Sequence, residues 1–390
     1  MSQERLESRW DETREALLEV LNGNRRNSMK VILENTRKYL KESASSGSTA
    51  SGNIATLNRV ILPVIRRVMP TVIANELVGV QPVTGPVGQI HTLRVRYADT
   101  FGSPAGVVAG SEALSPFDIA RFYSGNGDST TPLGAAVNVL EGTAGKRLNI
   151  QILKETVEAK TRKLSARWTF EAAQDAQAQQ GIDIEAEIMA ALAQEITAEI
   201  DQEILNSLRT LAGITLTYDQ GAVSGTATFV GDEHAALAVL INRVANLIAQ
   251  RTRRGAGNYA VVSSAALTVL QSATTSAFAR TTEGTFEAPT NTKFVGTLNG
   301  SMRVFVDSYA ADTTPVLVGY KGSSEADAPA FYCPYIPLMS SGVVLDPTTF
   351  EPVVSFMTRY GYIELTNTAS SFGNAGDYVG EIAVSNLSFS

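Results

Sequence analysis

The clearest pattern in this chain is a run of apolar residues spaced by four between Gly181 and Leu211. The run consists of Ile184, Ile188, Leu192, Ile196, Ile200, Ile204 and Leu208. Residues four apart stack on one side of an α-helix, so the spacing predicts one helix over residues 182–211, roughly 45 Å long. A spacing of four exceeds 3.6, so the stripe winds round the axis by about 40° per step. We therefore expect several elements to pack along this helix in succession.

Helix-like and strand-like patterns alternate through the rest of the chain. A second amphipathic helix is predicted over residues 232–251 and a short one over 265–271. Strand-like runs occupy residues 259–262, 302–306, 316–318, 343–345 and 352–362, and a polar strand is predicted at the C-terminal end. The expected fold class is α+β.

A long glycine-rich stretch precedes the predicted long helix. Residues 89–97 alternate between apolar and basic side chains, and eleven glycines lie between Gly79 and Gly145. Such a stretch has too little apolar surface for a core of its own. We expect an extended hairpin or long loop that contacts a partner, since long loops in compact domains are usually functional.

The first 42 residues form a highly charged, helix-prone piece followed by a flexible linker. The linker, residues 43–53, consists largely of Ser, Gly, Ala and Thr. This arrangement suggests a detachable module, and a frayed, solvated terminus is the alternative interpretation.

Composition narrows the class of protein. The 390 residues are 44% hydrophobic and 18% charged, which indicates a folded protein of two or more lobes. A net charge of -7 argues against a protein that coats nucleic acid over its whole surface. Cys333 is the single cysteine, so no intrachain disulfide forms. We also expect no secretory signal and no membrane span, and hence a soluble protein made in the cytoplasm.

The sequence contains no recognisable catalytic, cofactor or metal constellation. His91 and His234 are the two histidines, and they lie far apart without metal-ligand spacing. The acidic residues of the long helix lack the histidines of a di-iron site, so we expect a solvated acidic face: Glu185, Glu187, Glu195, Glu199, Asp201 and Glu203. We expect Arg251, Arg253 and Arg254 to form a solvated helix end or an ion pair between subunits. These observations predict that the protein is not an enzyme.

Four blocks of the chain resemble the major capsid protein of T-even-type contractile-tailed bacteriophages. They are VIRRVMPTVIANELVGVQPVTGPVGQIHTLRVRY from Val64, VEAKTRKLSARWTFEAAQDAQAQQGIDIEAEI from Val157, LNGSMRVFVDSYA from Leu298, and the segment from VGYKGSSEADAPAFYCPYIPL at Val318 to FEPVVSFMTRYG. They follow one another in the family's order across about two thirds of the chain.

The resemblance implies an HK97-like capsid fold, with an N-terminal arm, an extended loop, a peripheral domain and an axial domain. Residues 1–42 would be a scaffold-like helical segment and 43–84 the linker and N-arm. Residues 85–150 would form the extended loop over a neighbouring subunit, and 151–229 the peripheral domain with the spine helix 182–211. Residues 230–344 would form the axial domain, and 345–390 would return to the peripheral domain.

The implied function is structural. Copies would form hexamers and pentamers of an icosahedral tailed-phage head that encloses double-stranded DNA without sequence-specific binding. The implied partners are the chain itself, a scaffold protein, a prohead protease, a portal, and vertex or decoration proteins. The implied location is the virion capsid, assembled in the host bacterial cytoplasm. No cofactor and no membrane are expected.

The resemblance also implies proteolytic processing. In this family a prohead protease removes the N-terminal segment after a Leu/Ile-x-Glu signal. Leu40 and Glu42, followed by Ser43, match that signal at the helix–linker junction, so we expect cleavage after Glu42. The run Ile32-Leu33-Glu34 is a second candidate.

Three alternatives remain beside this interpretation. A vertex protein that occupies the pentamers would share these motifs, and copy number would separate the two. An encapsulin-type nanocompartment would use the same fold to enclose enzymes. A soluble enzyme with a site at His91 or His234 is the remote alternative.

Overall fold

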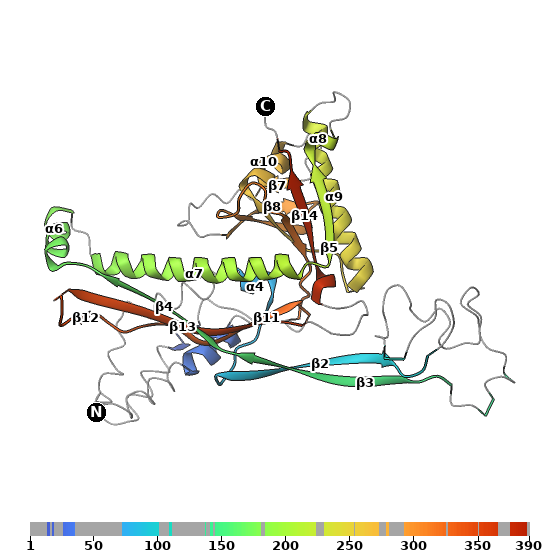
Figure 1. Ribbon diagram of the computed structural model, residues 1–390, viewed down its shortest axis with the longest axis horizontal. Helices are drawn as coiled ribbons and strands as arrows, with labels where there is room; N and C mark the ends of the chain where they lie inside the picture. The colour runs from blue at the N-terminus through green and yellow to red at the C-terminus, as the bar shows by residue number, and fades with distance from the viewer. Residues whose placement is uncertain are drawn as a thin grey trace.

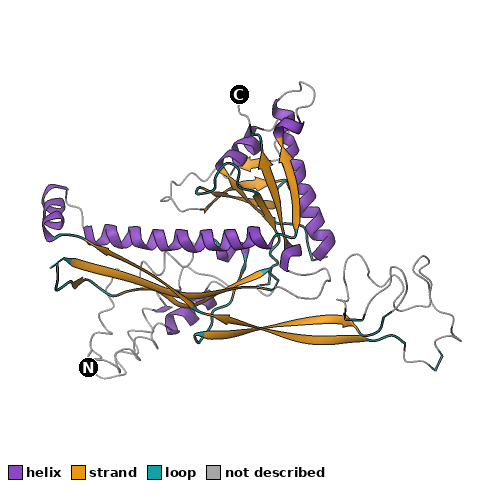
Figure 2. Ribbon diagram, viewed as in Figure 1, coloured by secondary structure: helices purple, strands orange, loops and turns teal. Residues whose placement is uncertain are grey.

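The computed structural model combines one long helix, two β-sheets and a projecting β-hairpin (Figures 1 and 2). It describes residues 14–15, 18, 26–35, 72–100, 109–110, 137, 141–142, 145–180, 184–223, 230–252, 254–272, 278–280, 292–324, 327–349, 351–365 and 375–387. The predicted linker and most of the segment 1–42 therefore lie outside the described residues. The mixture of helices and strands confirms the α+β class.

The long helix α7 spans Ile184–Leu211, 28 residues or about 42 Å. Leu192, Ile196, Ile200, Ile204 and Leu208 of the predicted stripe are all buried. They share one core with residues of both sheets and of the short helix α4, Ala74–Leu77. The helix is preceded by α6, Phe170–Gln180. The expectation that several elements pack along α7 is confirmed.

A five-stranded sheet packs along α7. Its main order is β1 (Gly79–Val80), β11 (Ala330–Ser340), β13 (Pro352–Glu364) and β12 (Val344–Leu345), and β4 (Lys160–Arg167) pairs with the other edge of β13. Along β13, Val354, Phe356 and Tyr360 are buried and belong to the same core as α7. This alternation along β13 is what a half-buried strand requires.

The second sheet has seven strands. Its order is β5 (Ile214–Asp219), β14 (Val379–Ser385), β10 (Val316–Gly319), β6 (Tyr259–Ser263), β9 (Met302–Asp307), β8 (Thr292–Leu298) and β7 (Phe278–Arg280). Helices α9 (Val230–Thr252) and α10 (Ser264–Ser272) pack on it. The short helices α8, Gln220–Val223, and η2, Ala375–Tyr378, lie at its connections. The predicted helices and strands of this region are confirmed to within two residues at most ends.

The glycine-rich stretch holds the first strand of a two-stranded antiparallel hairpin, and the second strand follows it directly. Strand β2, Val87–Tyr97, pairs along its whole length with β3, Leu148–Glu158. In Figure 1 the hairpin projects away from the rest of the molecule. The predicted hairpin is confirmed, and its second strand continues to Glu158, past the end at residue 150 that the resemblance implied.

The sheets do not follow the contiguous segments that the resemblance implied. β11 lies within 230–344 but joins the sheet that packs along α7. β5 lies within 151–229 and β14 within 345–390, yet both join the seven-stranded sheet. Within residues 345–390, β13 lies in the sheet on α7, whereas the last strand, β14, lies in the seven-stranded sheet. Ile382 and Val384 of β14 are buried in the core of the seven-stranded sheet, where β14 pairs with β5 and β10, a long-range pairing that no local pattern encodes.

Candidate assembly surfaces

The two histidines of the enzyme alternative lie apart in the structure. His91 is exposed on the hairpin, opposite Lys154. His234 is buried on α9, where its Nδ1 lies 2.6 Å from Ser272 Oγ and its Nε2 lies 3.3 Å from Gln220 Nε2. Ser272 Oγ also lies within donating distance of the Thr268 carbonyl, at 2.8 Å, and of the Val269 carbonyl, at 3.1 Å. His234 thus joins α8, α9 and α10 as a packed residue of the fold.

The sequence predicts that the acidic face of α7 is solvated, but in the structure part of this face is paired with other elements. Arg162 on β4 donates to Glu199 and to Glu203 at 2.6 Å each. Arg162 Nε also donates to Tyr360 Oη at 2.6 Å, and that hydroxyl donates to Glu203. Burial acts to raise the pKa of Glu203, but the hydrogen bonds from Arg162 and Tyr360 hold it below its usual value. The prediction was wrong here because the partners of these acidic residues come from strands 37 to 157 positions away.

Asp201 is the second departure from the predicted acidic face. It is 3% exposed, and its Oδ1 accepts a hydrogen bond from the Ile73 backbone N–H at 2.9 Å. Burial raises the pKa of Asp201 to about 7, although the hydrogen bond from Ile73 acts in the opposite direction. This carboxyl group connects α7 to the residue that precedes α4.

A third polar contact connects α7 to the seven-stranded sheet. Asp307, at the end of β9, is fully buried. It accepts a hydrogen bond from Gln202 at 2.7 Å and forms an ion pair with Arg209 at 3.1 Å. A buried carboxylate needs such partners, so this contact holds the two sheets in a defined arrangement about α7.

The arginines at the end of α9 form pairs within the chain, which corrects the expectation of a solvated end or an inter-subunit pair. Arg251 lies 3.2 Å from Asp377 and donates to the Gly213 carbonyl at 2.9 Å. Arg254 lies 2.9 Å from Asp327. Arg253 is outside the described residues. These ion pairs join the C-terminal end of α9 to the segments that carry Asp327 and Asp377.

An exposed apolar row runs along β3 of the hairpin. Leu148, Ile150 and Ile152 are 54%, 68% and 65% exposed. Alternate residues of a strand lie on one face, so these three side chains form a continuous strip. Sequence reasoning missed this row, although the alternation Leu-Asn-Ile-Gln-Ile was visible, because we ended the loop at residue 150.

A second apolar stretch lies at the edge of the five-stranded sheet. Val343, Val344 and Leu345 are exposed, and the last two form the edge strand β12. Exposed apolar edges are templates for association with another chain. The hairpin row and this edge are therefore candidate contact surfaces.

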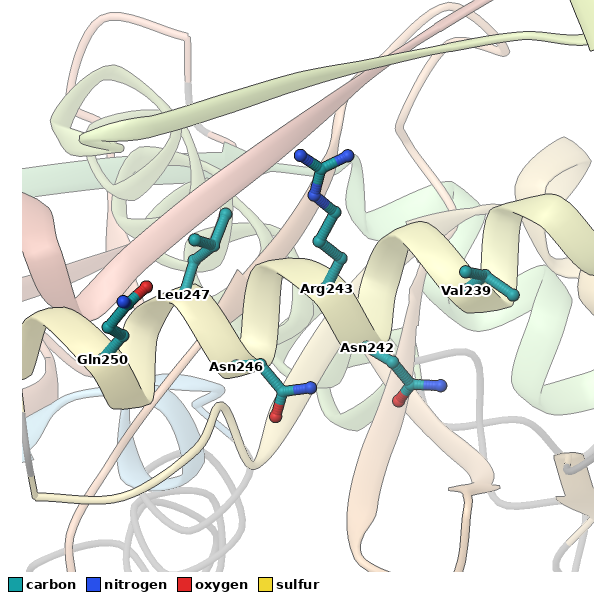
Figure 3. A pocket seen from close by; sticks show the side chains of 6 residues that line it. All are labelled: Val239, Asn242, Arg243, Asn246, Leu247 and Gln250. Atoms are coloured by element: carbon teal, nitrogen blue, oxygen red, sulfur yellow. The ribbon is translucent and has the colours of Figure 1, made fainter.

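One exposed face of α9 lines an open hollow of about 540 Å³ (Figure 3). Its lining consists of Val239, Asn242, Arg243, Asn246, Leu247 and Gln250, which project from successive turns of the helix. Asn242 accepts a hydrogen bond from Asn299 at 2.7 Å. Arg243 is the one charged side chain of this lining, so the hollow lacks the paired acid and base of a hydrolytic site.

Leu40, Glu42 and Ser43, the predicted processing residues, lie outside the described residues. Within the described part of the chain, no three His, Cys, Asp or Glu residues gather in a way that could hold a metal ion. No helix in that part is long and apolar enough to cross a membrane.

Comparisons with known proteins show which family this chain resembles. The major capsid protein of Vibrio phage KVP40 is 29% identical over 414 residues, covering 83% of this chain and 80% of that protein. The major capsid protein of Enterobacteria phage T6 is 30% identical over 413 residues, covering 83% and 81%. That of Enterobacteria phage T4 is 29% identical over 413 residues, covering 83% and 78%.

Solved structures show a more distant similarity. One described as Mycobacterium phage Adephagia has a TM-score of 0.48 and 12% identity, covering 82% of this chain and 91% of that chain. The capsid of Myoviridae phage XM1 has a TM-score of 0.43 and 12% identity, covering 79% and 89%. At these scores the family assignment depends on sequence. A family model described as "Major capsid protein Gp23" matches residues 54–384. The chain therefore belongs to the Gp23 major capsid protein family and is a capsid shell protein of T4-like phages.

Proposed function

We propose that this chain forms the hexamers and pentamers of an icosahedral tailed-phage head that encloses double-stranded DNA. The observation that carries the proposal is the projecting β2–β3 hairpin with its exposed row Leu148, Ile150 and Ile152. An isolated two-stranded hairpin is marginally stable in water, and a solvent-facing apolar row adds to that cost. A neighbouring copy that covers the row would stabilise the hairpin and remove its apolar side chains from water.

The hairpin would then act as the extended loop of an HK97-like fold. In this proposal α7 and the five-stranded sheet form the peripheral domain, and the seven-stranded sheet with α9 and α10 forms the axial domain. Closed shells form from many repeated contacts, each of modest size. A net charge of -7 suits a shell that holds DNA without adhering to it.

The proposed partners follow from the family. They are a scaffold protein, a prohead protease that cuts after Glu42, a portal, and vertex or decoration proteins, with assembly in the host cytoplasm. We also propose that the chain has no enzymatic activity of its own. A pentamer-specific vertex protein and an encapsulin-type shell are not favoured, because the matched family and relatives are described as major capsid proteins.

Negative-stain microscopy of the protein, expressed alone and with its own phage proteins, tests the proposal. We expect closed icosahedral shells, or sheets and tubes of hexamers. A monodisperse monomer that never assembles, even with scaffold and protease present, would contradict it.

A further inference from the structure

A ladder of backbone hydrogen bonds joins β1 and the residues that follow it to β11, at one edge of the five-stranded sheet. Beyond the two residues of β1, Gln81 N–H donates to the Tyr332 carbonyl at 3.0 Å and Val83 N–H donates to the Pro334 carbonyl at 3.1 Å. The ladder is parallel and reaches no further among the described residues. The carbonyls of Val83 and Tyr335 lie just past its end.

Tyr335 is also an irregular point of β11. Pro334 pairs with Tyr360 and Ile336 pairs with Arg359, so Tyr335 is an extra residue without an opposing residue on β13. Such bulges interrupt the regular pairing of a ladder. The Tyr335 carbonyl is partly buried and needs a donor from elsewhere, because backbone groups withdrawn from water are destabilising when they are unpaired.

Asn35 supplies that donor. Its side chain is 5% exposed, and its Nδ2 donates to the Val83 carbonyl at 2.9 Å and to the Tyr335 carbonyl at 3.2 Å. A side-chain amide carries two N–H groups, which matches two acceptors. One residue thus closes the end of the ladder across a separation of 300 positions.

Asn35 belongs to the N-terminal segment, where residues 26–35 are helical (blue in Figure 1). Met29, Ile32 and Leu33, spaced as on one helical face, are at most 2% exposed. Arg26 pairs with Glu15 at 3.1 Å, which connects this helix to the residues before it. The segment is therefore a packed unit that is attached to the sheet through Asn35.

We propose that the Val83 and Tyr335 carbonyls form a docking site for the chain's own N-terminal segment, anchored by Asn35, which keeps that segment bound after the chain is cut behind Glu42. This deepens the processing proposed above and rests on it for its biological consequence. The cut breaks one peptide bond and leaves the Asn35 contacts and the buried helical face in place. Release of the segment is thus a separate, non-covalent step.

The test uses the full-length chain with a recognition sequence for a site-specific protease inserted in the linker 43–53. After cutting, size-exclusion chromatography and native mass spectrometry report whether the fragment stays with the body. We expect the fragment to stay bound in the wild-type sequence. Asn35→Asp has the same shape but directs a carboxylate at two carbonyls, so its fragment should dissociate at least tenfold faster.

Asn27→Asp is the matched control, since it makes the same change at an exposed position of the same helix. It should behave like the wild type. Should Asn35→Asp disturb folding before the cut, as judged by circular dichroism, Asn35→Ala removes the donors without adding charge and should give the same loss.

Two results would overturn the proposal: immediate loss of the wild-type fragment, or equal retention in the Asn35 variants. Because the added protease makes the cut, neither result depends on shell assembly or on the natural cleavage position.

Discussion

Asp201 shows how a single side chain on α7 can make stability depend on pH. Its carboxyl group is buried and its pKa is raised to about 7, against about 3.9 in an unfolded chain. Between these values the folded state holds a proton that the unfolded state has released. The contribution of Asp201 to stability is therefore full below about pH 4 and is lost as pH rises through about 7.

The variant Asp201→Asn should remove this pH dependence. The amide oxygen can still accept from the Ile73 N–H, and no charge forms in the core. We expect the variant to match the wild type near pH 4 and to exceed its stability at pH 8, by up to about 4 kcal/mol for a shift of three pKa units. Urea unfolding of the full chain at several pH values measures this. Glu195→Gln, an exposed change on the same helix, is the control, and parallel curves for Asp201→Asn and wild type would refute the account.

Arg162 is the residue through which β4 and α7 are joined. Removing it leaves Glu199, Glu203 and Tyr360 without their shared donor. We expect Arg162→Ala to cost about 1–2 kcal/mol, since the cluster is partly exposed and solvent screens its charges. A double-mutant cycle with Glu203→Ala should show coupling of at least about 0.5 kcal/mol. Lys163→Ala, the next residue of the strand and exposed, should be near neutral. Strict additivity would show that the pairs contribute nothing.

At the scale of elements, the β2–β3 hairpin is the part whose exposed apolar side chains favour contact with a partner over contact with water. Ile150→Glu places a charge in the middle of the exposed row. We expect the free protein to change by less than about 0.5 kcal/mol, because the side chain is already solvated. Assembly should fall at least tenfold, since the charge would be buried against the neighbour. Light scattering or particle counts by microscopy measure this. Gln151→Glu, on the opposite face of the strand, is the control, and undiminished assembly of Ile150→Glu would remove the hairpin from the interface.

The helices and strands could be predicted because their signals are local. The four-residue spacing predicted α7, and short alternating runs predicted β6, β9, β10 and β13. The pairing of these strands could not be predicted, since β14 joins β5 and β10 through contacts between distant segments. Hence each sheet contains strands from more than one of the contiguous segments that the resemblance implied.

The polar contacts were equally inaccessible to sequence reasoning. Nothing near Asn35 or Arg162 distinguishes them from other polar residues, and their partners appear only once the sheet has formed. The apolar row of the hairpin, unlike these polar contacts, could have been predicted. The alternation of Leu148, Ile150 and Ile152 with polar residues is a local signal of an apolar strand face.

At the scale of the whole molecule, α7 holds the two sheets and the N-terminal segment docks beside them. The buried Asp307 pair and the shared core restrain the sheets about α7. The hairpin and the segment that carries Asn35 are the parts whose surroundings would change on assembly and processing.

The proposed cleavage after Glu42 can be tested on the whole chain. The intact mass of the chain from purified virions should correspond to a protein that begins at Ser43. An N-terminus after Glu34 would instead favour the second signal. A full-length chain in mature virions would contradict cleavage altogether.

The most direct test of the central claim is a cryo-electron-microscopy map of the assembled shell at side-chain resolution. The account predicts that the β2–β3 hairpin lies over an adjacent copy, with Leu148, Ile150 and Ile152 buried in that contact. A closed shell in which these three side chains face solvent would contradict it.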